Sequence, residues 1–228
     1  HNKTEVIYHS IDPIKKLSKK KKQIIFVGKL NEAKGYDLFC EAVDKVLKKY
    51  NHWKAFSIGD EKRFQEYYTN KNQINLGLLE NKKVLKIFQE SEIAVIPSRW
   101  DEPFGRTALE SSSRGCATII SNKGGLTETT NDAIVLKKLD SANIEKEILK
   151  LIKNTTLRKK LQISGIKNLK HVLKLNSIKI DFMRSTLFPF SNFNTNNGKL
   201  RILNIYNLAQ KLKHRIYNLS LGKKFTNG

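Results

Sequence analysis

At 228 residues with 39% hydrophobic residues, the chain is long enough for one well-buried domain with an appendage, or for two small domains. Its net charge of +22 invites phosphate-bearing or anionic partners, although lysine spread along the whole chain is also what a biased genome composition produces. Cys40 and Cys116 lack CxxC or metal-ligand spacing, which argues against a disulfide framework. No apolar run approaches the roughly 20 residues of a membrane helix, which argues against a membrane span. Together these features predict a cytoplasmic protein.

Residues 1–23 are predicted to be a hinge followed by a basic linker. The densest cluster of positive charge is "KKLSKKKKQ" at residues 15–23, which comes just before the first apolar run and is expected to be solvated. The chain begins at His1 without a methionine, so we expect it to be an excerpt of a longer protein.

Short apolar runs alternate with amphipathic segments of helix length from residue 24 to about residue 170, and residues 24–187 are expected to form one domain. The first run is "IIFVG" at residues 24–28, and the segment at 35–50 places apolar residues at helical spacing. The pattern recurs, with strands expected at residues 54–60, 74–77, 92–98, 117–121 and 133–136 and helices at 61–71, 81–89, 103–114 and 142–153. It predicts an α/β fold, a Rossmann-like parallel sheet with helices on both faces.

Ligands of such sheets bind where the loops after the strands converge. The loop "GKLNEAKG", residues 28–35, joins the first strand to its helix; Gly28 permits a tight turn, and Lys29 and Lys34 are placed to face an anion near the helix start. The Walker pattern is absent, and two solvated loop lysines are the alternative.

The stretch "EPFGRTALE" places Glu102 at the entrance of the helix predicted from Pro103 to Arg114, and Glu110 about two turns further in. Gly105 removes a side chain in the first turn, which lets a phosphate approach the backbone amides of Phe104, Gly105 and Arg106. The alternative is a carboxylate favoured by the helix dipole and an ordinary surface glutamate.

These residues carry a resemblance to a known family. "VIYHSID", "GKLNEAKG", the Glu-x7-Glu segment and "TIISNKGGLTE", in this order, resemble the hinge and nucleotide-sugar-binding half of GT-B retaining glycosyltransferases of family 4, glycosyltransferase group 1. The resemblance covers about residues 5–185 and implies the C-terminal half of a GT-B fold.

The resemblance also implies roles for individual residues. Glu102, as the catalytic residue, would hold the hydroxyls of the donor sugar, and Glu110 would accept hydrogen bonds from the ribose. The remaining donor-binding residues would contact the diphosphate or frame the base: Gly28, Lys29 and Lys34, the amides of Phe104, Gly105 and Arg106, and the backbone near Leu78 and Leu79. No metal or other cofactor is expected, because side chains and helix ends stabilise the leaving group.

Two positions depart from the family pattern. Position 29 is usually arginine, so Lys29 offers the phosphates a point charge in place of a bidentate fork. Arg106 stands where the family often has an apolar residue, and it either restores the missing cation or faces solvent.

The function that follows is transfer of a sugar from a nucleotide-sugar, such as a UDP- or GDP-sugar, to a glycan or lipid-linked acceptor with retention of configuration, in surface-polysaccharide assembly. The acceptor domain would precede the hinge, so this chain alone should be inactive. The alternative is a non-enzymatic basic module that binds nucleic acid or a membrane surface. That reading leaves Glu102 and Glu110 unexplained, and carboxylates repel phosphate chains, which disfavours nucleic acid.

After helices at residues 155–170 and 177–187, residues 188–198 have the Asn, Ser, Pro and Gly composition of a linker. Residues 199–228 leave three interpretations open. They begin a second glycosyltransferase module, they form a basic amphipathic helix that associates with an anionic membrane, or they have no fixed structure.

Overall fold

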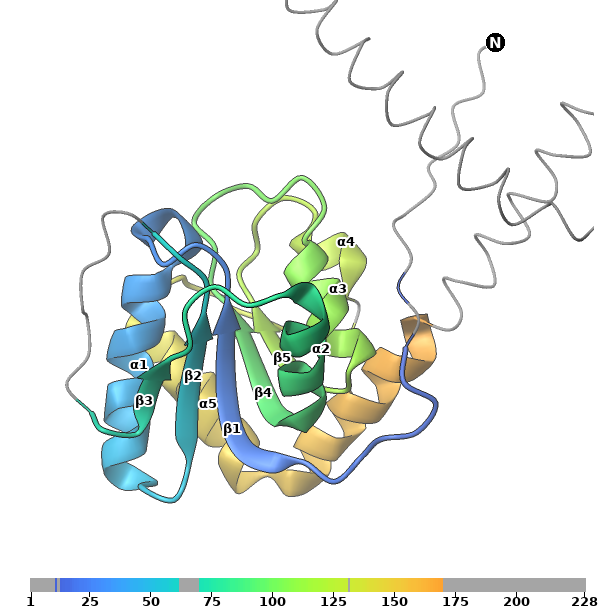
Figure 1. Ribbon diagram of the computed structural model, residues 1–228, viewed down its shortest axis with the longest axis horizontal. Helices are drawn as coiled ribbons and strands as arrows, with labels where there is room; N and C mark the ends of the chain where they lie inside the picture. Colours follow the sequence, from blue (N-terminus) through green and yellow to red (C-terminus); the bar gives the residue numbers. More distant parts are fainter. Residues whose placement is uncertain (1–10, 12, 62–69, 131, 170–228) are drawn as a thin grey trace, which may run out of the picture. The chain divides into compact units, whose positions relative to one another are not determined.

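The strands of this chain lie side by side in one parallel sheet (Figure 1). The computed structural model describes residues 11, 13–61, 70–130 and 132–169, which belong to a compact unit of residues 1–179. The predicted linker at 188–198, the tail at 199–228, the helix at 177–187 and nearly all of the hinge "VIYHSID" lie outside the described residues.

Six strands pair within the described part of the chain, in the order β3-β2-β1-β4-β5-β6, and every neighbouring pair is parallel. Their bounds are β1 (Lys21–Val27), β2 (Lys54–Ile58), β3 (Gln73–Asn75), β4 (Ser91–Ile96), β5 (Ala117–Ile120) and β6 (Ile134–Val135). The order reverses direction between β1 and β4, which makes that position the topological switch point of the sheet.

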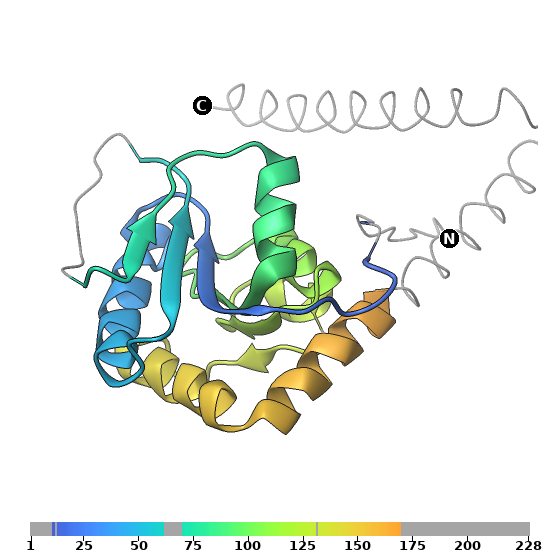
Figure 2. The ribbon, with the colours of Figure 1, turned by 60° about the horizontal axis from the view of Figure 1, so that its bottom comes forward.

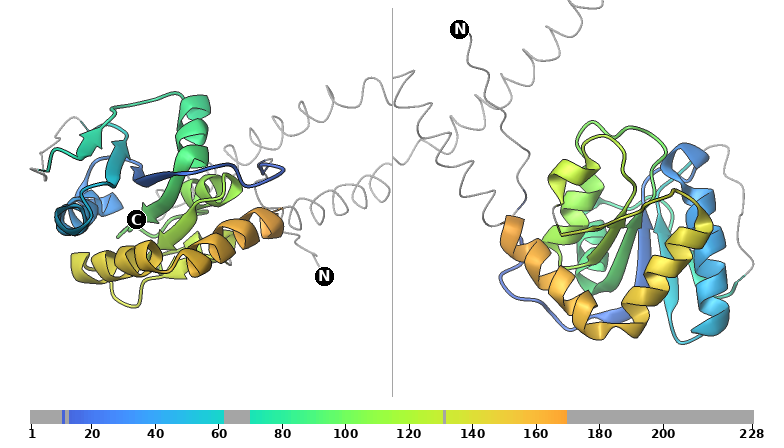
Figure 3. Two further views of the ribbon diagram at one scale, coloured as in Figure 1. Left: turned by 90° about the horizontal axis from the view of Figure 1, so that it is seen from below. Right: turned by 180° about the vertical axis from the view of Figure 1, so that it is seen from behind.

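Helices cover both faces of the sheet (Figures 2 and 3). The first face carries α1 (Tyr36–Lys49) and α5 (Ser141–Lys153), and the second carries α2 (Asn81–Glu90), α3 (Arg106–Ser113) and α4 (Leu126–Thr129). A short 3-10 helix, η1 (Glu32–Lys34), precedes α1, and residues 155–169 form a further helix after α5. The sequence-based prediction of a parallel sheet covered on both faces is therefore confirmed.

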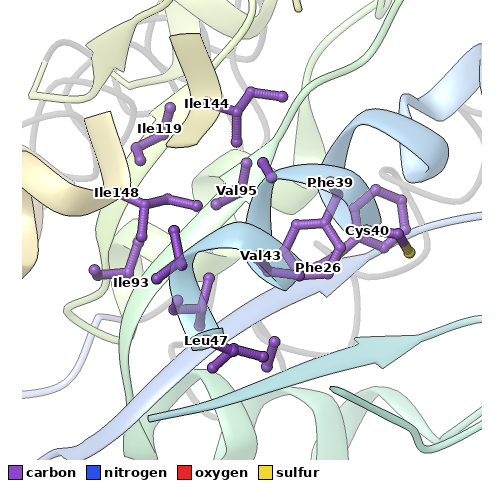
Figure 4. Close-up of a cluster of buried hydrophobic side chains, with 14 of the residues drawn as sticks. Phe26, Phe39, Cys40, Val43, Leu47, Ile93, Val95, Ile119, Ile144 and Ile148 are labelled. Carbon is purple, nitrogen blue, oxygen red and sulfur yellow. The ribbon is translucent and has the colours of Figure 1, made fainter. Parts of the chain in front are cut away.

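Successive side chains of each strand point to opposite faces of the sheet, so the strands contribute to two hydrophobic cores. Ile93 and Val95 of β4 pack toward α1 and α5, whereas Ala94 and Ile96 pack toward the other helices. Figure 4 shows the first core, where side chains of α1 such as Val43 meet side chains of the central strands and α5. A sheet buried on both faces explains why the strands read as continuous apolar runs.

Several boundaries differ from the prediction, most of them by one or two residues, and three of the differences bear on the fold. Strand β1 begins at Lys21, inside the cluster expected to be linker. Asn70 and Lys71 are not helical, and residues 62–69 of the predicted helix lie outside the described part. Helix α3 begins at Arg106 and not at Pro103, because Gly105 takes the left-handed conformation, with φ +80°, and interrupts the helical backbone there.

Lys20 also contradicts the expectation of a solvated linker. Its Nζ donates to the carbonyls of Gln89 at 3.0 Å and Arg114 at 2.8 Å, which are at the C-terminal ends of α2 and α3. Burial lowers the pKa of Lys20, and carbonyls at helix C-termini favour a cation. The part of the predicted linker around Lys20 is thus anchored at the C-terminal ends of α2 and α3.

Candidate functional site

The loops after β1 and β4 flank the switch point of the sheet, at the edge where the strand arrows end in Figure 1. Ligands of open parallel sheets bind in the crevice at this point, because the loops on its two sides diverge toward opposite faces. The loop after β1 carries Lys29 and Lys34, and the loop after β4 carries Glu102. The topology therefore brings together two motifs that the sequence could only place at strand ends.

Lys34 and Glu102 form an ion pair across this crevice. Lys34 Nζ donates to Glu102 Oε1 at 2.5 Å, although the two residues are 68 positions apart in the chain. Their side chains are only 29% and 18% exposed, so solvent screens the pair less than it screens a surface pair. Lys34 of the loop after β1 and the carboxylate predicted to be catalytic thus occupy one partly buried site.

The Gly124-Gly125 loop after β5 supports Glu102 through the backbone. Gly125 N donates to Glu102 O at 2.6 Å. Gly124 has φ +51°, and a Cβ there would lie 2.3 Å from Glu102 O, so a side chain at this position clashes with the segment that carries the carboxylate. The sequence identified this loop only as part of a family pattern; its physical function is to let the two loops touch.

Gly105 acts at the start of α3 and not inside its first turn. A Cβ at Gly105 would lie 3.0 Å from Leu126 Cδ2 and from Thr129 Oγ1, so glycine permits both the positive φ and the close approach of α4. The amides of Gly105 and Arg106 donate to no acceptor among the described residues. They lie at the N-terminus of α3, where the helix dipole attracts negative charge.

Glu110 is held inside α3 by donors on one of its two oxygens. The residue is 5% exposed, and Oε1 accepts from Asn81 Nδ2 at 3.0 Å and from Arg106 Nε at 2.9 Å. Within the described part of the chain, Oε2 receives no hydrogen bond. An oriented, buried carboxylate with one available oxygen is suited to accept a hydroxyl of a ligand.

The other predicted residues differ in their surroundings. Lys29 is exposed, and its ammonium forms no hydrogen bond or ion pair with the described residues. Arg106 is 74% exposed and directs its guanidinium to Glu110. Leu78 is 71% exposed in the loop after β3, whereas Leu79 packs against the second core.

The backbone of Gly28 lies against the backbone of Gly59, which follows β2. Gly28 N donates to Ile58 O at 3.0 Å, and a Cβ on Gly59, with φ +150°, would lie 1.8 Å from Gly28 O. The shape of the first loop therefore depends on Gly59, which lies in one of the loops expected to bind a ligand but was not itself among the predicted site residues.

Asn81 and Arg99 were not predicted from the sequence either. Asn81 opens α2 and contacts Glu110, while Arg99 follows β4 and contacts Asp37 in the first turn of α1. No sequence signal identifies either one, because each partner lies on a different element.

The described part of the chain contains neither a cysteine activated as a nucleophile nor a cluster of side chains suited to hold a metal ion. Burial raises the pKa of Cys40 to about 12 and that of Cys116 to about 11, so both thiols are protonated at neutral pH and neither is an activated nucleophile. Among residues 11, 13–61, 70–130 and 132–169, no group of three His, Cys, Asp or Glu side chains is arranged to hold a metal ion. The same residues include no helix that is both long and apolar enough to span a membrane.

Comparison with protein families and curated sequences gives consistent matches. A family model described as "Glycosyl transferases group 1" matches residues 9–168. An uncharacterized 41.2 kDa protein of the cps region of Klebsiella pneumoniae is 30% identical over 166 residues, or 65% of this chain and 45% of that protein. An uncharacterized glycosyltransferase of Methanocaldococcus jannaschii is 31% identical over 113 residues, or 47% of this chain and 29% of that protein. The chain spans less than half the length of these relatives.

Solved structures share the fold. The C-terminal domain of the glycosyl transferase group 1 family protein LpcC from Francisella tularensis is 23% identical, with a TM-score of 0.59 over 70% of this chain and 94% of that one. HepE of Anabaena, solved in complex with UDP-glucose, is 15% identical, with a TM-score of 0.61 over 72% of this chain and 49% of that one. At these identities the likeness concerns the fold alone.

Proposed function

Because the chain belongs to the group 1 glycosyl transferases, we propose that it is the donor-binding half of a retaining enzyme of glycosyltransferase family 4. The enzyme would transfer a sugar from a nucleoside diphosphate sugar to a glycan or lipid-linked acceptor, in surface-polysaccharide assembly in the cytoplasm. A domain preceding the hinge would bind the acceptor. The observation that carries the proposal is the Lys34–Glu102 pair, which lies beside the helix that contains Glu110.

The diphosphate of the donor would occupy the crevice at the switch point. Lys34 and Lys29 supply positive charge from the first loop, and the amides of Phe104, Gly105 and Arg106 supply donors at the start of α3. Cations and amide dipoles that are already in place stabilise the nucleoside diphosphate that leaves as the glycosidic bond breaks. No metal ion enters this proposal, since these groups provide the required charge.

Glu110 would bind the ribose and Leu78 and Leu79 would frame the base. Oε1 of Glu110 is held by Asn81 and Arg106, so Oε2 is oriented to accept a ribose hydroxyl. This arrangement lets one buried carboxylate act on a neutral part of the ligand while the phosphates lie near the helix N-terminus. UDP-glucose bound to HepE, which shares the fold, supports a nucleotide-sugar as the ligand class.

Glu102 would act at the sugar. In the structure its carboxylate pairs with Lys34. A diphosphate in the crevice would compete for the lysine, so that Glu102 would accept hydrogen bonds from the sugar hydroxyls beside the reacting carbon.

A titration tests this function against the alternative of a basic nucleic-acid module. The 228-residue chain is titrated by calorimetry with UDP, GDP and their sugars, and with duplex DNA at several salt concentrations. We expect saturable binding of one nucleotide class, and DNA binding that weakens steeply with salt because it depends on counterion release. Lys34→Ala should reduce affinity for the nucleoside diphosphate more than for the nucleoside, since Lys34 would face the phosphates. Tight DNA binding without nucleotide binding would refute the transferase.

A further inference from the structure

Arg99 links the loop after β4 to the loop after β1. Its guanidinium contacts Asp37 through both ends of the fork, with Nη1–Oδ1 at 2.6 Å and Nη2–Oδ2 at 2.7 Å. Nη1 also donates to the carbonyl of Glu32 at 2.5 Å. Arg99 therefore contacts both the residue that opens η1 and the first turn of α1, and Lys34 lies between them in the sequence.

Backbone contacts join the same two loops. The amides of Arg99 and Trp100 both donate to the carbonyl of Ala33, at 2.9 and 3.0 Å. A Cβ at Gly35, where φ is +71°, would lie 2.0 Å from the carbonyl oxygen of Pro97. The residues immediately before and after Lys34 are thus both in contact with the segment that leads from β4 to Glu102.

We propose that Arg99 is a positioning residue for the donor diphosphate, which it serves by holding Lys34 in place opposite Glu102. The inference rests on the proposed function and names a residue that would determine phosphate affinity without touching the ligand. Arg99 directs its guanidinium to Asp37 and Glu32, so its effect on a phosphate passes through the loop that carries Lys34.

Arginine suits this position better than lysine. A guanidinium fork satisfies both oxygens of a carboxylate and still has a donor for a carbonyl, whereas a single ammonium cannot maintain this geometry. Arg99 is 38% exposed and Asp37 is 22% exposed. An isolated ion pair with such exposure contributes little to global stability. A large effect on ligand affinity with a small effect on unfolding would therefore identify a positioning function.

The test compares Arg99→Lys and Arg99→Ala with the wild-type 228-residue chain, using calorimetry with UDP, GDP and ADP and NMR titration with the matching nucleosides. We expect both variants to bind the preferred diphosphate about tenfold more weakly, with nucleoside affinity unchanged within about twofold. Added to Lys34→Ala, the Arg99 substitutions should cause little further loss, because they act through that lysine. Lys49→Ala, which breaks an ion pair with Glu145 at the other end of α1, is the matched control and should bind as wild type.

A second readout needs no ligand. In Arg99→Lys, the amides of Gly35 and Tyr36, which donate to the carbonyls of Glu32 and Asn31, should exchange hydrogen faster than in the wild type, while the core strands keep their protection. Wild-type exchange at these amides would overturn the inference, as would diphosphate binding by Arg99→Lys equal to that of the wild type. Equal losses for diphosphate and nucleoside would indicate a general structural effect and overturn it too. If the wild type bound no nucleoside diphosphate, the proposed function would fail first.

Discussion

At the scale of single residues, the two carboxylates of the Glu-x7-Glu segment are partnered in different ways. Glu102 is paired with Lys34, for which a bound diphosphate would compete. Glu110 is buried, and one of its oxygens accepts hydrogen bonds from Asn81 and Arg106. Under the proposed function the contact of Glu102 with Lys34 would be replaced by a ligand, whereas the contacts of Glu110 keep its carboxylate oriented. Substitutions at the two positions should therefore have opposite effects on nucleotide affinity.

Glu110→Ala should weaken nucleotide binding by about 1 to 3 kcal/mol, because ligand hydroxyls and the amide of Asn81 would lose their buried acceptor. Isothermal calorimetry with the nucleoside diphosphate measures the loss. Glu90→Ala removes a carboxylate that pairs with exposed Lys21 and should leave the affinity unchanged. An unchanged affinity for Glu110→Ala would contradict the proposed ribose contact.

Glu102→Gln should strengthen binding of the nucleoside diphosphate by about 0.5 to 1 kcal/mol, roughly two- to fivefold, because Lys34 loses the anionic partner that it has among the described residues. In an enzyme that includes the acceptor domain, the same substitution should depress kcat. Asp101→Asn is the matched control, since the neighbouring carboxylate is 78% exposed and lies 4.0 Å from Lys123. Weaker diphosphate binding in Glu102→Gln would argue against competition for Lys34.

At the scale of elements, glycines set how closely the loops at the carboxyl edge approach one another. Gly35 lies against Pro97, Gly59 lies against Gly28, and Gly124 lies against Glu102. In each pair the partner is backbone, which cannot rotate away as a side chain can. The loops at the strand ends can therefore approach one another this closely only with glycine at positions 35, 59 and 124.

Gly124→Ala should destabilise the chain more than Gly77→Ala, although both glycines have positive φ. A Cβ at Gly77 would meet no atom within 4 Å, so alanine there introduces only backbone strain of about 1 to 2 kcal/mol. At Gly124 the clash with Glu102 O adds to that strain, and we expect a further loss of about 1 kcal/mol or more. Urea denaturation of both variants measures the difference. Equal losses of stability in the two variants would show that the loop at Gly124 can move away from Glu102 without an energetic cost.

At the scale of the whole molecule, stability comes from two apolar layers that enclose the sheet. Cys40 belongs to the first layer, where it is 1% exposed and packs near Phe26 and Phe39 (Figure 4). Burial raises the pKa of its thiol to about 12 from an ordinary value of 9.0, with a smaller opposing effect of its hydrogen bond to Tyr36. The folded chain thus keeps this proton at pH values where the unfolded chain loses it.

The Cys40 thiol should lower the free energy of unfolding at alkaline pH. Above about pH 9 the unfolded state binds fewer protons than the folded state, so the contribution of Cys40 to the free energy of unfolding declines by about 1.4 kcal/mol per pH unit until about pH 12. Cys40→Ala removes this dependence. The stability difference between wild type and Cys40→Ala should be constant from about pH 7 to pH 8 and should shift in favour of the variant above about pH 9, as measured by urea denaturation. Parallel pH profiles would contradict the assignment.

Much of the fold could be predicted from local pattern. Continuous apolar runs such as "IIFVG" and "EIAVIPS" indicate strands that are buried on both faces, and the amphipathic segments between them indicate covering helices. Because parallel strands end at one edge, the same pattern placed Lys34 and Glu102 among the loops of that edge. The start of α3 could not be predicted in this way. Gly105 adopts a positive φ against Leu126 and Thr129 of α4, and those contacts are invisible to a local pattern.

By itself, then, the sequence determined the parallel sheet, the helical layers and the set of loops that carry polar residues, since each depends on the periodicity of neighbouring residues. Only the tertiary structure decided which of these loops meet. The strand order places β4 beside β1, and this neighbourhood creates the Lys34–Glu102 pair and the contact of Arg99 with Asp37. It likewise brings α2 beside α3, so that Asn81 orients Glu110. Such contacts join residues tens of positions apart, and their geometry follows from how the strands cross over, which no local spacing encodes.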